Sequence, residues 1–247
     1  MFHKLWINAL LLITAVFATH VHAQNKVVNV GFVVGIPPFV IGEEGILVDI
    51  IGEALKRSDY KISNYKFPSK QFDQDPLNTF DELDIFIGTP LSFRVDYSYG
   101  KVFEFDNVAV SKASSELTID SVSDLKGKYI VGFNNAKQHL KEPFTTFYNQ
   151  ELANWDGYKE IENQQAQFDM LIKDRTQVIL LDRSMAYYYA SKAGVKNMEG
   201  FVFHEIFPIK NTIYVVGRDQ KYIQLIKQNL NEMERDGTLL ALVEKYR

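Results

Sequence analysis

The sequence predicts an α/β fold in which short buried strands alternate with amphipathic helices. Three observations support this class. The chain contains several short runs of β-branched and apolar residues, stretches with helical spacing lie between them, and no repeat or low-complexity linker interrupts the pattern. Alternating segments of this length are typical of sheets that are largely parallel and covered by helices.

The elements follow one another in a clear order. Val27–Val34 is a β-branched run that ends at Gly35–Pro38, which predicts a buried strand followed by a turn. The remaining segments are predicted from the same two patterns: helix 48–56, strand 84–88, strand 129–133, strand 177–181, helix 182–193, strand 213–216, and a long amphipathic stretch 222–246 that breaks at Asp236-Gly237.

Composition excludes several classes of function. The chain has 247 residues, a formal charge of −4 and no cysteine, with 46% hydrophobic and 23% charged residues. Without cysteine there is no disulfide framework, thiol nucleophile or zinc–thiolate site. An acidic balance argues against a nucleic-acid partner, which needs a clustered basic face. The chain contains no hydrolase elbow, zincin, Walker or dinucleotide motif, and we therefore expect no enzyme, no catalytic residue and no cofactor.

The first residues have the pattern of a secretory signal peptide. Met1–Lys4 is short and weakly basic, Leu5–Ala18 is apolar, and Val21-His22-Ala23 has small residues where signal peptidase requires them. We expect cleavage after Ala23, which makes 1–23 a signal peptide and places the mature protein in the periplasm or outside the cell. A retained membrane anchor is the alternative. The mature chain then keeps only His139 and His204, too few for a histidine-rich metal site.

Five segments of the mature chain form a recognisable series. They are Pro37-Pro38-Phe39 with Gly45–Ile50; Asp84–Thr89 with Arg94; Val122–Lys128 with Val131–Phe133; Val178–Asp182 with Ala186-Tyr187; and Met233–Leu239. Each is weak alone, but together they cover nearly the whole mature chain. In this order they resemble the extracellular solute-binding proteins of the amino-acid type, the soluble receptors of ABC importers (family 3, type II periplasmic-binding-protein fold).

The resemblance implies two α/β lobes joined by two hinge crossings. Lobe one is expected at 25–107 and 213–247, lobe two at 111–205, and the hinges at about 107–110 and 206–212. The implied function is capture of an amino acid or small carboxylate in the cleft, as a monomer that delivers it to a membrane permease. Two alternatives are a ligand sensor for a membrane receptor, with the same fold, and a periplasmic dehydratase, for which only Glu104 and Glu205 come into consideration as the acid.

Arg94 is the sharpest candidate for ligand binding. Its guanidinium is a planar fork of donors that matches a carboxylate. The spacing from Thr89 to Arg94 is that of the family's cleft arginine, and Gly88 and Thr89 are expected to supplement it. The alternative is a surface arginine paired with Asp96.

Asp182 ends a run of four apolar residues and is expected to emerge at the carboxyl end of its strand, where the family binds the ligand's ammonium group. It is also a suitable N-cap for the helix that follows. Phe39 and Phe72 stand where family members place rings beside the ligand.

One stretch departs from the family pattern. Asn134–Gln138 replaces the usual glycine and hydroxyl residue after the lobe-two strand, which leaves the backbone amides at Ala136 and Lys137 to meet a carboxylate. Val33 and Ile36 stand where cation-binding members have acidic and tyrosine side chains. An uncharged ligand side chain is therefore expected, with a small organic acid held mainly by Arg94 as the alternative.

Overall fold

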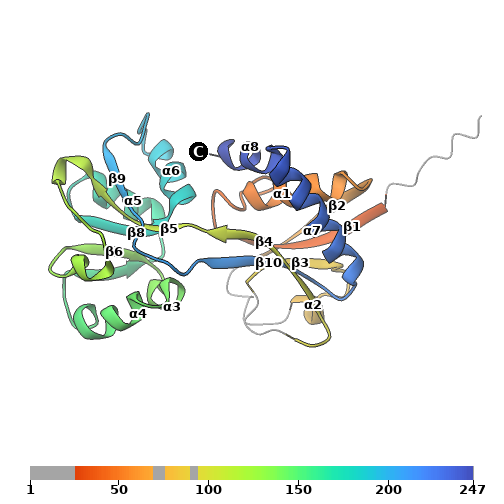
Figure 1. Cartoon of the computed structure of the whole chain (residues 1–247), viewed down its shortest axis with the longest axis horizontal. Helices are drawn as coiled ribbons and strands as arrows, with labels where there is room; N and C mark the ends of the chain where they lie inside the picture. Colours follow the sequence, from red (N-terminus) through yellow and green to blue (C-terminus); the bar gives the residue numbers. More distant parts are fainter. Residues whose placement is uncertain (1–25, 69–75, 90–93, 247) are drawn as a thin grey trace, which may run out of the picture.

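The chain forms two lobes, each built around a five-stranded sheet, that lie side by side and are joined at a waist by two strands of the chain (Figure 1). The computed structural model describes residues 26–68, 76–89 and 94–246. Within these ranges, no helix is both long and apolar enough to span a membrane.

Lobe one contains both ends of the described chain. Its sheet has the order β2-β1-β3-β10-β4, and helices α1, α7 and α8 pack together beside it (Figure 1). The elements are β1 (Lys26–Val34), α1 (Ile46–Lys56), β2 (Tyr60–Pro68), α2 (Pro76–Thr79), β3 (Ile85–Gly88), β4 (Ser98–Phe105), β10 (Asn211–Gly217), α7 (Gln220–Arg235) and α8 (Thr238–Glu244).

Lobe two lies between β4 and β10 in sequence. Its sheet has the order β7-β6-β8-β5-β9. The elements are β5 (Asn107–Lys112), β6 (Ile130–Phe133), α3 (Ala136–Leu140), α4 (Phe144–Phe147), β7 (Tyr158–Ile161), α5 (Gln164–Ile172), β8 (Val178–Asp182), α6 (Arg183–Lys192) and β9 (Phe201–His204), with short irregular helical turns at 113–115, 122–125 and 148–152.

Both sheets are mixed. In each, two neighbouring pairs of strands are parallel and two are antiparallel. The parallel pairs join β1 to β2 and β3, and β6 to β7 and β8; of these strands, β2 and β7 were not predicted from the sequence. The antiparallel pairs all involve β10 or β5, because these strands arrive from the other lobe and enter their sheets from the waist.

The two crossings are short. β4 ends at Phe105 and β5 begins at Asn107, so Asp106 alone separates the first pair of strands. The second crossing, 205–210, joins β9 to β10. The structure therefore places 107–110, expected as hinge, inside the lobe-two sheet, where Asn107 lies opposite Asp182.

A buried polar pair ties β5 to β9. The Ser111 hydroxyl lies 2.9 Å from Nε2 of His204, and both residues are buried. Burial lowers the pKa of His204, although a hydrogen bond with the backbone of Ile119 and the charge of Asp120 act to raise it. The imidazole is therefore held neutral within the fold.

We predict that His204 makes the protein less stable in mild acid. A group whose pKa is lowered by folding binds protons more readily in the unfolded chain, so its stabilisation is complete above about pH 6.5 and is lost as the pH falls below that value. The free energy of unfolding, measured in denaturant at about pH 5 and about pH 7.5, should rise more steeply with pH for the wild type than for His204→Gln. Equal slopes for the two proteins would contradict this assignment.

Candidate functional site

The carboxyl ends of the central parallel strands of both sheets point toward the waist. In lobe one, Gly88 at the end of β3 lies opposite Tyr214 of β10, which has just left the second crossing. In lobe two, Asp182 at the end of β8 lies opposite Asn107, which follows the first crossing directly. Loops and helix N-termini that follow these ends therefore face one another between the lobes. In open α/β sheets this edge is where ligands bind.

Asp182 is almost completely buried, with 3% of its surface exposed. Its Oδ1 accepts hydrogen bonds from the backbone N–H groups of Ser184 and Met185, at 2.7 and 3.3 Å, and its Oδ2 accepts one from Asp106 N at 2.7 Å. The residue thus caps α6, the second of the two roles that its sequence position suggested. Burial raises the pKa of Asp182 to about 7, although these three donors act to lower it.

Arg94 is paired with Asp96. Its Nε and Nη2 donate to the two carboxylate oxygens at 3.0 and 2.8 Å, and the guanidinium also lies 5.0 Å from the ring centre of Tyr97. Both side chains of the pair are about half exposed, at 41% and 52%. This is the ion pair that the sequence offered as the alternative to a ligand contact. A ligand carboxylate would have to compete with Asp96 for the same fork.

Gly88 and Thr89 lie where the sequence placed them, at the waist end of β3. Gly88 is buried in the sheet, and the hydroxyl of the exposed Thr89 donates to the carbonyl of Thr212 on β10 at 3.2 Å. Thr89 thus links two lobe-one strands close to the second crossing.

Phe39 is fully buried rather than open to the space between the lobes. Its ring packs edge-on against Phe103 and Phe105 of β4, with centroid distances of 5.4 and 4.7 Å. These two rings are only half buried and share one face of the strand that leads into the first crossing. The apolar surface next to the waist is therefore provided by Phe103 and Phe105. Phe72 lies outside the described residues.

The loop after β6 is already occupied by a carboxylate of the chain itself. Glu160, on β7, accepts hydrogen bonds from the backbone N–H groups of Asn135 and Lys137, at 2.9 and 3.3 Å, and from the Tyr158 hydroxyl at 2.7 Å. Ala136 is fully buried beside this loop. The Lys137 amide expected to meet a ligand carboxylate therefore has an internal partner.

Gly132 makes this arrangement possible. A Cβ at this position would lie 2.9 Å from the Tyr158 hydroxyl and 3.2 Å from the Cβ of Ala136. Burial and the hydrogen bond to Glu160 both raise the pKa of Tyr158, which keeps the phenol protonated as a donor. Glu160 is thus fixed by Tyr158 on its own strand and by backbone N–H groups that follow β6.

A cluster of charged side chains at the waist was not predicted from the sequence. Arg183, the first residue of α6, donates from Nε to Asp106 and from Nη2 to Glu205, each at 2.6 Å, and Lys210 Nζ donates to the other oxygen of Asp106 at 2.8 Å. Burial acts to raise the pKa of the Asp106 carboxyl, but the hydrogen bonds from Arg183 and Lys210 outweigh it and lower that pKa. The partners lie 77, 22 and 104 residues apart in the chain, so no local motif could reveal them.

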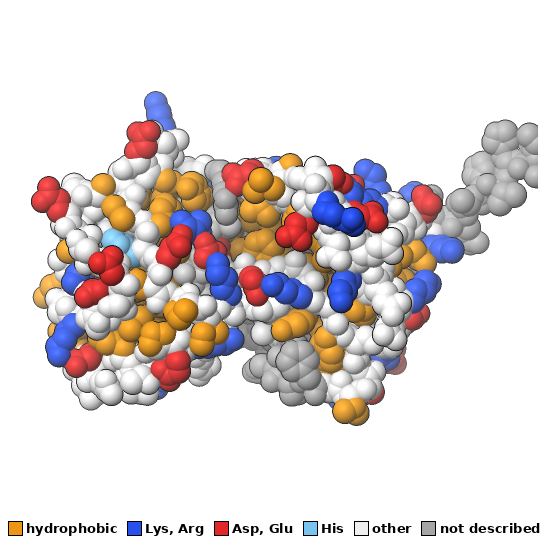
Figure 2. Space-filling model, in the orientation of Figure 1, with side chains coloured by type: hydrophobic (Ala, Val, Ile, Leu, Met, Phe, Trp, Pro, Cys, Tyr) orange, Lys and Arg blue, Asp and Glu red, His pale blue; other side chains and the backbone are white. Residues whose placement is uncertain are grey.

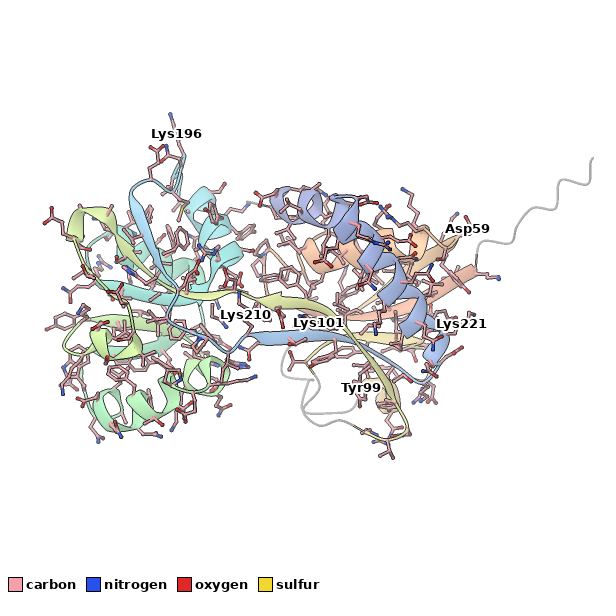
Figure 3. The ribbon with its side chains drawn as sticks, viewed as in Figure 1. Asp59, Tyr99, Lys101, Lys196, Lys210 and Lys221 are labelled. Carbon is pink, nitrogen blue, oxygen red and sulfur yellow. The ribbon has the colours of Figure 1, made fainter. Side chains whose placement is uncertain are left out.

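These charges connect both crossings to lobe two. Figure 2 shows positive and negative side chains side by side across the waist, and Figure 3 places Lys210 and Lys101 on the crossing strands. Lys101 pairs with Glu104 on the lobe-one side at 2.9 Å. No group of three or more His, Asp or Glu residues with the geometry of a metal site occurs in the described parts of the chain.

Comparison with solved structures places this architecture in a known fold. A substrate-binding protein of an ABC uptake transporter from Streptococcus pneumoniae, with bound histidine, matches with a TM-score of 0.61 and 17% identity over 90% of this chain and 92% of that one. The GluR0 ligand-binding core with L-glutamate matches at 0.64, with 20% identity over 90% and 99%. The chain has the periplasmic-binding-protein fold.

A third structure shows the same likeness. The substrate-binding protein of a polar amino acid ABC uptake transporter from Streptococcus thermophilus matches this chain with a TM-score of 0.67 and 17% identity. The match covers 90% of this chain and 86% of that one. No family model matches the sequence, and no curated protein matches it. At these identities the likeness concerns the fold.

We predict that removing the Asp182 carboxylate destabilises lobe two more than removing an ordinary helix cap. Asp182→Ala should lower the free energy of unfolding by about 2–4 kcal/mol, because it removes the cap of α6 and leaves the N–H of Asp106 without an acceptor. Asn163, whose side chain accepts from Ala166 N at the start of α5, provides the matched control. Asn163→Ala should cost about 1 kcal/mol. Equal losses in denaturant unfolding would contradict the special role of Asp182.

Proposed function

We propose that the chain is a periplasmic solute-binding protein that captures an amino acid or related small carboxylate between its lobes for the permease of an ABC importer. The observation that supports this most strongly is the arrangement of the two sheets, whose central strands end facing one another across two short crossings. Closure of two such lobes around a solute is a recurrent hinge motion. Structures with this fold bind histidine and glutamate.

The chemistry of the facing edges suits a small zwitterion. At the waist, Asp182 offers a buried carboxylate toward an ammonium group. Arg94 lies beside Tyr97 and Tyr99 near the start of β4. In this proposal its fork of donors exchanges Asp96 for the ligand carboxylate. Phe103 and Phe105 provide a half-buried aromatic surface for aliphatic groups. These features favour an uncharged ligand side chain.

The residues at the end of β1 support the same preference. Val33 is buried with Leu77 and Phe86 on one face of the lobe-one sheet, while Ile36 is half buried against the main core. Neither offers an acceptor to a ligand cation, and burying an unpaired ammonium or guanidinium there would be costly. L-arginine and L-lysine are therefore poor ligands in this proposal.

A ligand sensor that signals to a membrane receptor is the second candidate, because the GluR0 ligand-binding core has the same fold. We do not propose a reaction. The hydrogen bond from Lys101 lowers the pKa of Glu104, and Glu205 is held by Arg183 in an ion pair. Both carboxylates are thus placed as partners of cations, and the lowered pKa of Glu104 does not suit a general acid, which must hold its proton near neutral pH.

The ligand proposal is tested with Arg94 and its internal competitor. Binding would be measured by thermal shift and calorimetry with L-leucine, L-glutamine, L-glutamate, L-histidine, L-arginine and succinate. Arg94→Ala should weaken the tightest-binding probe by at least about tenfold, whereas Asp96→Ala should strengthen it, because the guanidinium loses its competing carboxylate. Binding that Arg94→Ala leaves within twofold, or a panel with no binder at all, would overturn the proposal.

Export is proposed from the first residues alone. The expected mature protein begins at Gln24, so intact mass and N-terminal sequencing of the exported protein should find residues 1–23 removed. A secreted form that retains them would contradict signal-peptide cleavage after Ala23.

A further inference from the structure

Asn107 carries a buried donor that has no partner in the part of the chain that the structure describes. Only 8% of the residue is exposed, and its Nδ2 is shielded from solvent without an acceptor among the described residues. Most buried polar side-chain atoms are hydrogen-bonded, because an unsatisfied one destabilises the folded state. The amide of Asn107 is therefore a costly feature that the fold alone does not explain.

Asn107 lies at the edge of lobe two that faces the space between the lobes. It follows the one-residue crossing directly and lies opposite Asp182 in the antiparallel register of β5 and β8. Residues directly opposite in such a pair project to the same face with Cβ atoms about 5 Å apart. Ala109, two residues along β5 and on the same face, packs in the cluster of Ala136 and Phe207. Asn107 therefore shares one face of the sheet with Asp182, at the end of β5 next to the first crossing.

Asn211 shows that the fold can satisfy an asparagine in the equivalent place. It begins β10 as Asn107 begins β5, and it is similarly buried, with 9% exposed. Its Nδ2 donates to the carbonyl of His139 at the end of α3, at 2.7 Å. Two asparagines therefore begin the two strands that leave the crossings, and the one beside Asp182 lacks an acceptor.

The carboxylate of Asp182 can accept one more hydrogen bond. An ionised carboxylate can accept about four hydrogen bonds. Oδ1 of Asp182 accepts two and Oδ2 accepts one, the latter from Asp106 N. No side-chain cation reaches this carboxylate in the described structure, and its burial raises its pKa to about 7. A spare donor on Asn107 and a spare acceptor on Asp182 therefore lie on one face of the sheet, next to each other in register.

We propose that Asn107 binds the ligand, donating from Nδ2 to its carboxylate while Asp182 accepts from its ammonium group. The inference rests on the proposed function and makes its substrate class specific: a solute that carries both groups on one carbon, as an α-amino acid does, rather than a simple organic acid. Since an α-amino acid carries an acceptor and a donor on the same carbon, one ligand can satisfy both side chains. The cost of the unpaired amide is then offset only in the complex.

The experiment compares Asn107→Leu with the matched variant Asn211→Leu. Thermal unfolding without ligand comes first: Asn107→Leu should unfold at the same or a higher temperature than the wild type, since it removes an unsatisfied donor, whereas Asn211→Leu should unfold at a lower one because His139 loses its donor. Calorimetry then uses whichever of L-leucine, L-glutamine, L-glutamate, L-histidine and L-arginine binds the wild type most tightly, together with succinate. Asn107→Leu should weaken the amino acid at least about tenfold.

Each outcome has one meaning. Amino-acid affinity unchanged in Asn107→Leu overturns this inference and leaves the proposed function intact. A fall in unfolding temperature as large as that of Asn211→Leu also overturns it, since Nδ2 would then have a resident partner such as a bound water. If succinate binds more tightly than every amino acid, the proposal that the ligand carries both an ammonium and a carboxylate group is contradicted. A wild type that binds none of the probes overturns both this inference and the proposed function.

Discussion

Asp106 is the residue on which the relation between the two lobes depends. It is the whole of the first crossing, and all of its polar groups are engaged. Its N–H donates to Asp182, its carbonyl accepts from Arg183 N at 2.9 Å, and its carboxylate receives Arg183 and Lys210. The first crossing is thus fixed to the start of α6 and to the second crossing at once.

Aromatic side chains on both sides of Asp106 pack next to this junction. Phe105, next to Asp106 in the chain, packs on Phe39, so a movement of β4 would carry the aromatic surface with it. Arg183 stacks its guanidinium 5.0 Å from the ring centre of Phe203, which in turn stacks on Tyr187 of α6. Several of these charges are partly exposed, and exposed ion pairs contribute little to stability. Their effect is on geometry, because they hold the two crossings and α6 in one arrangement.

The elements could be predicted from sequence where burial leaves a local pattern. Ile85–Gly88 and Val178–Asp182 are continuous apolar runs, and the structure makes them the central strands of their sheets. The N-cap role of Asp182 could be predicted because the residue ends such a run. Asp106 and Glu160 could not be found this way, because their partners lie on other elements and depend on register. Phe103 and Phe105 alternate like any half-buried strand, which does not distinguish a core from a binding surface.

Two carboxylates of the chain, Asp96 and Glu160, already occupy donors that were expected to bind a ligand carboxylate. Asp96 already satisfies the fork of Arg94, and Glu160 satisfies the amides of Asn135 and Lys137. A ligand carboxylate that replaces Asp96 exchanges one charged hydrogen bond for another, so Asp96 offsets part of what Arg94 contributes to ligand affinity. The remaining affinity must come from groups that have no internal partner and from apolar contact. Asn107 and the half-buried rings of β4 meet those two conditions, whereas the positions most visible in the sequence are already occupied.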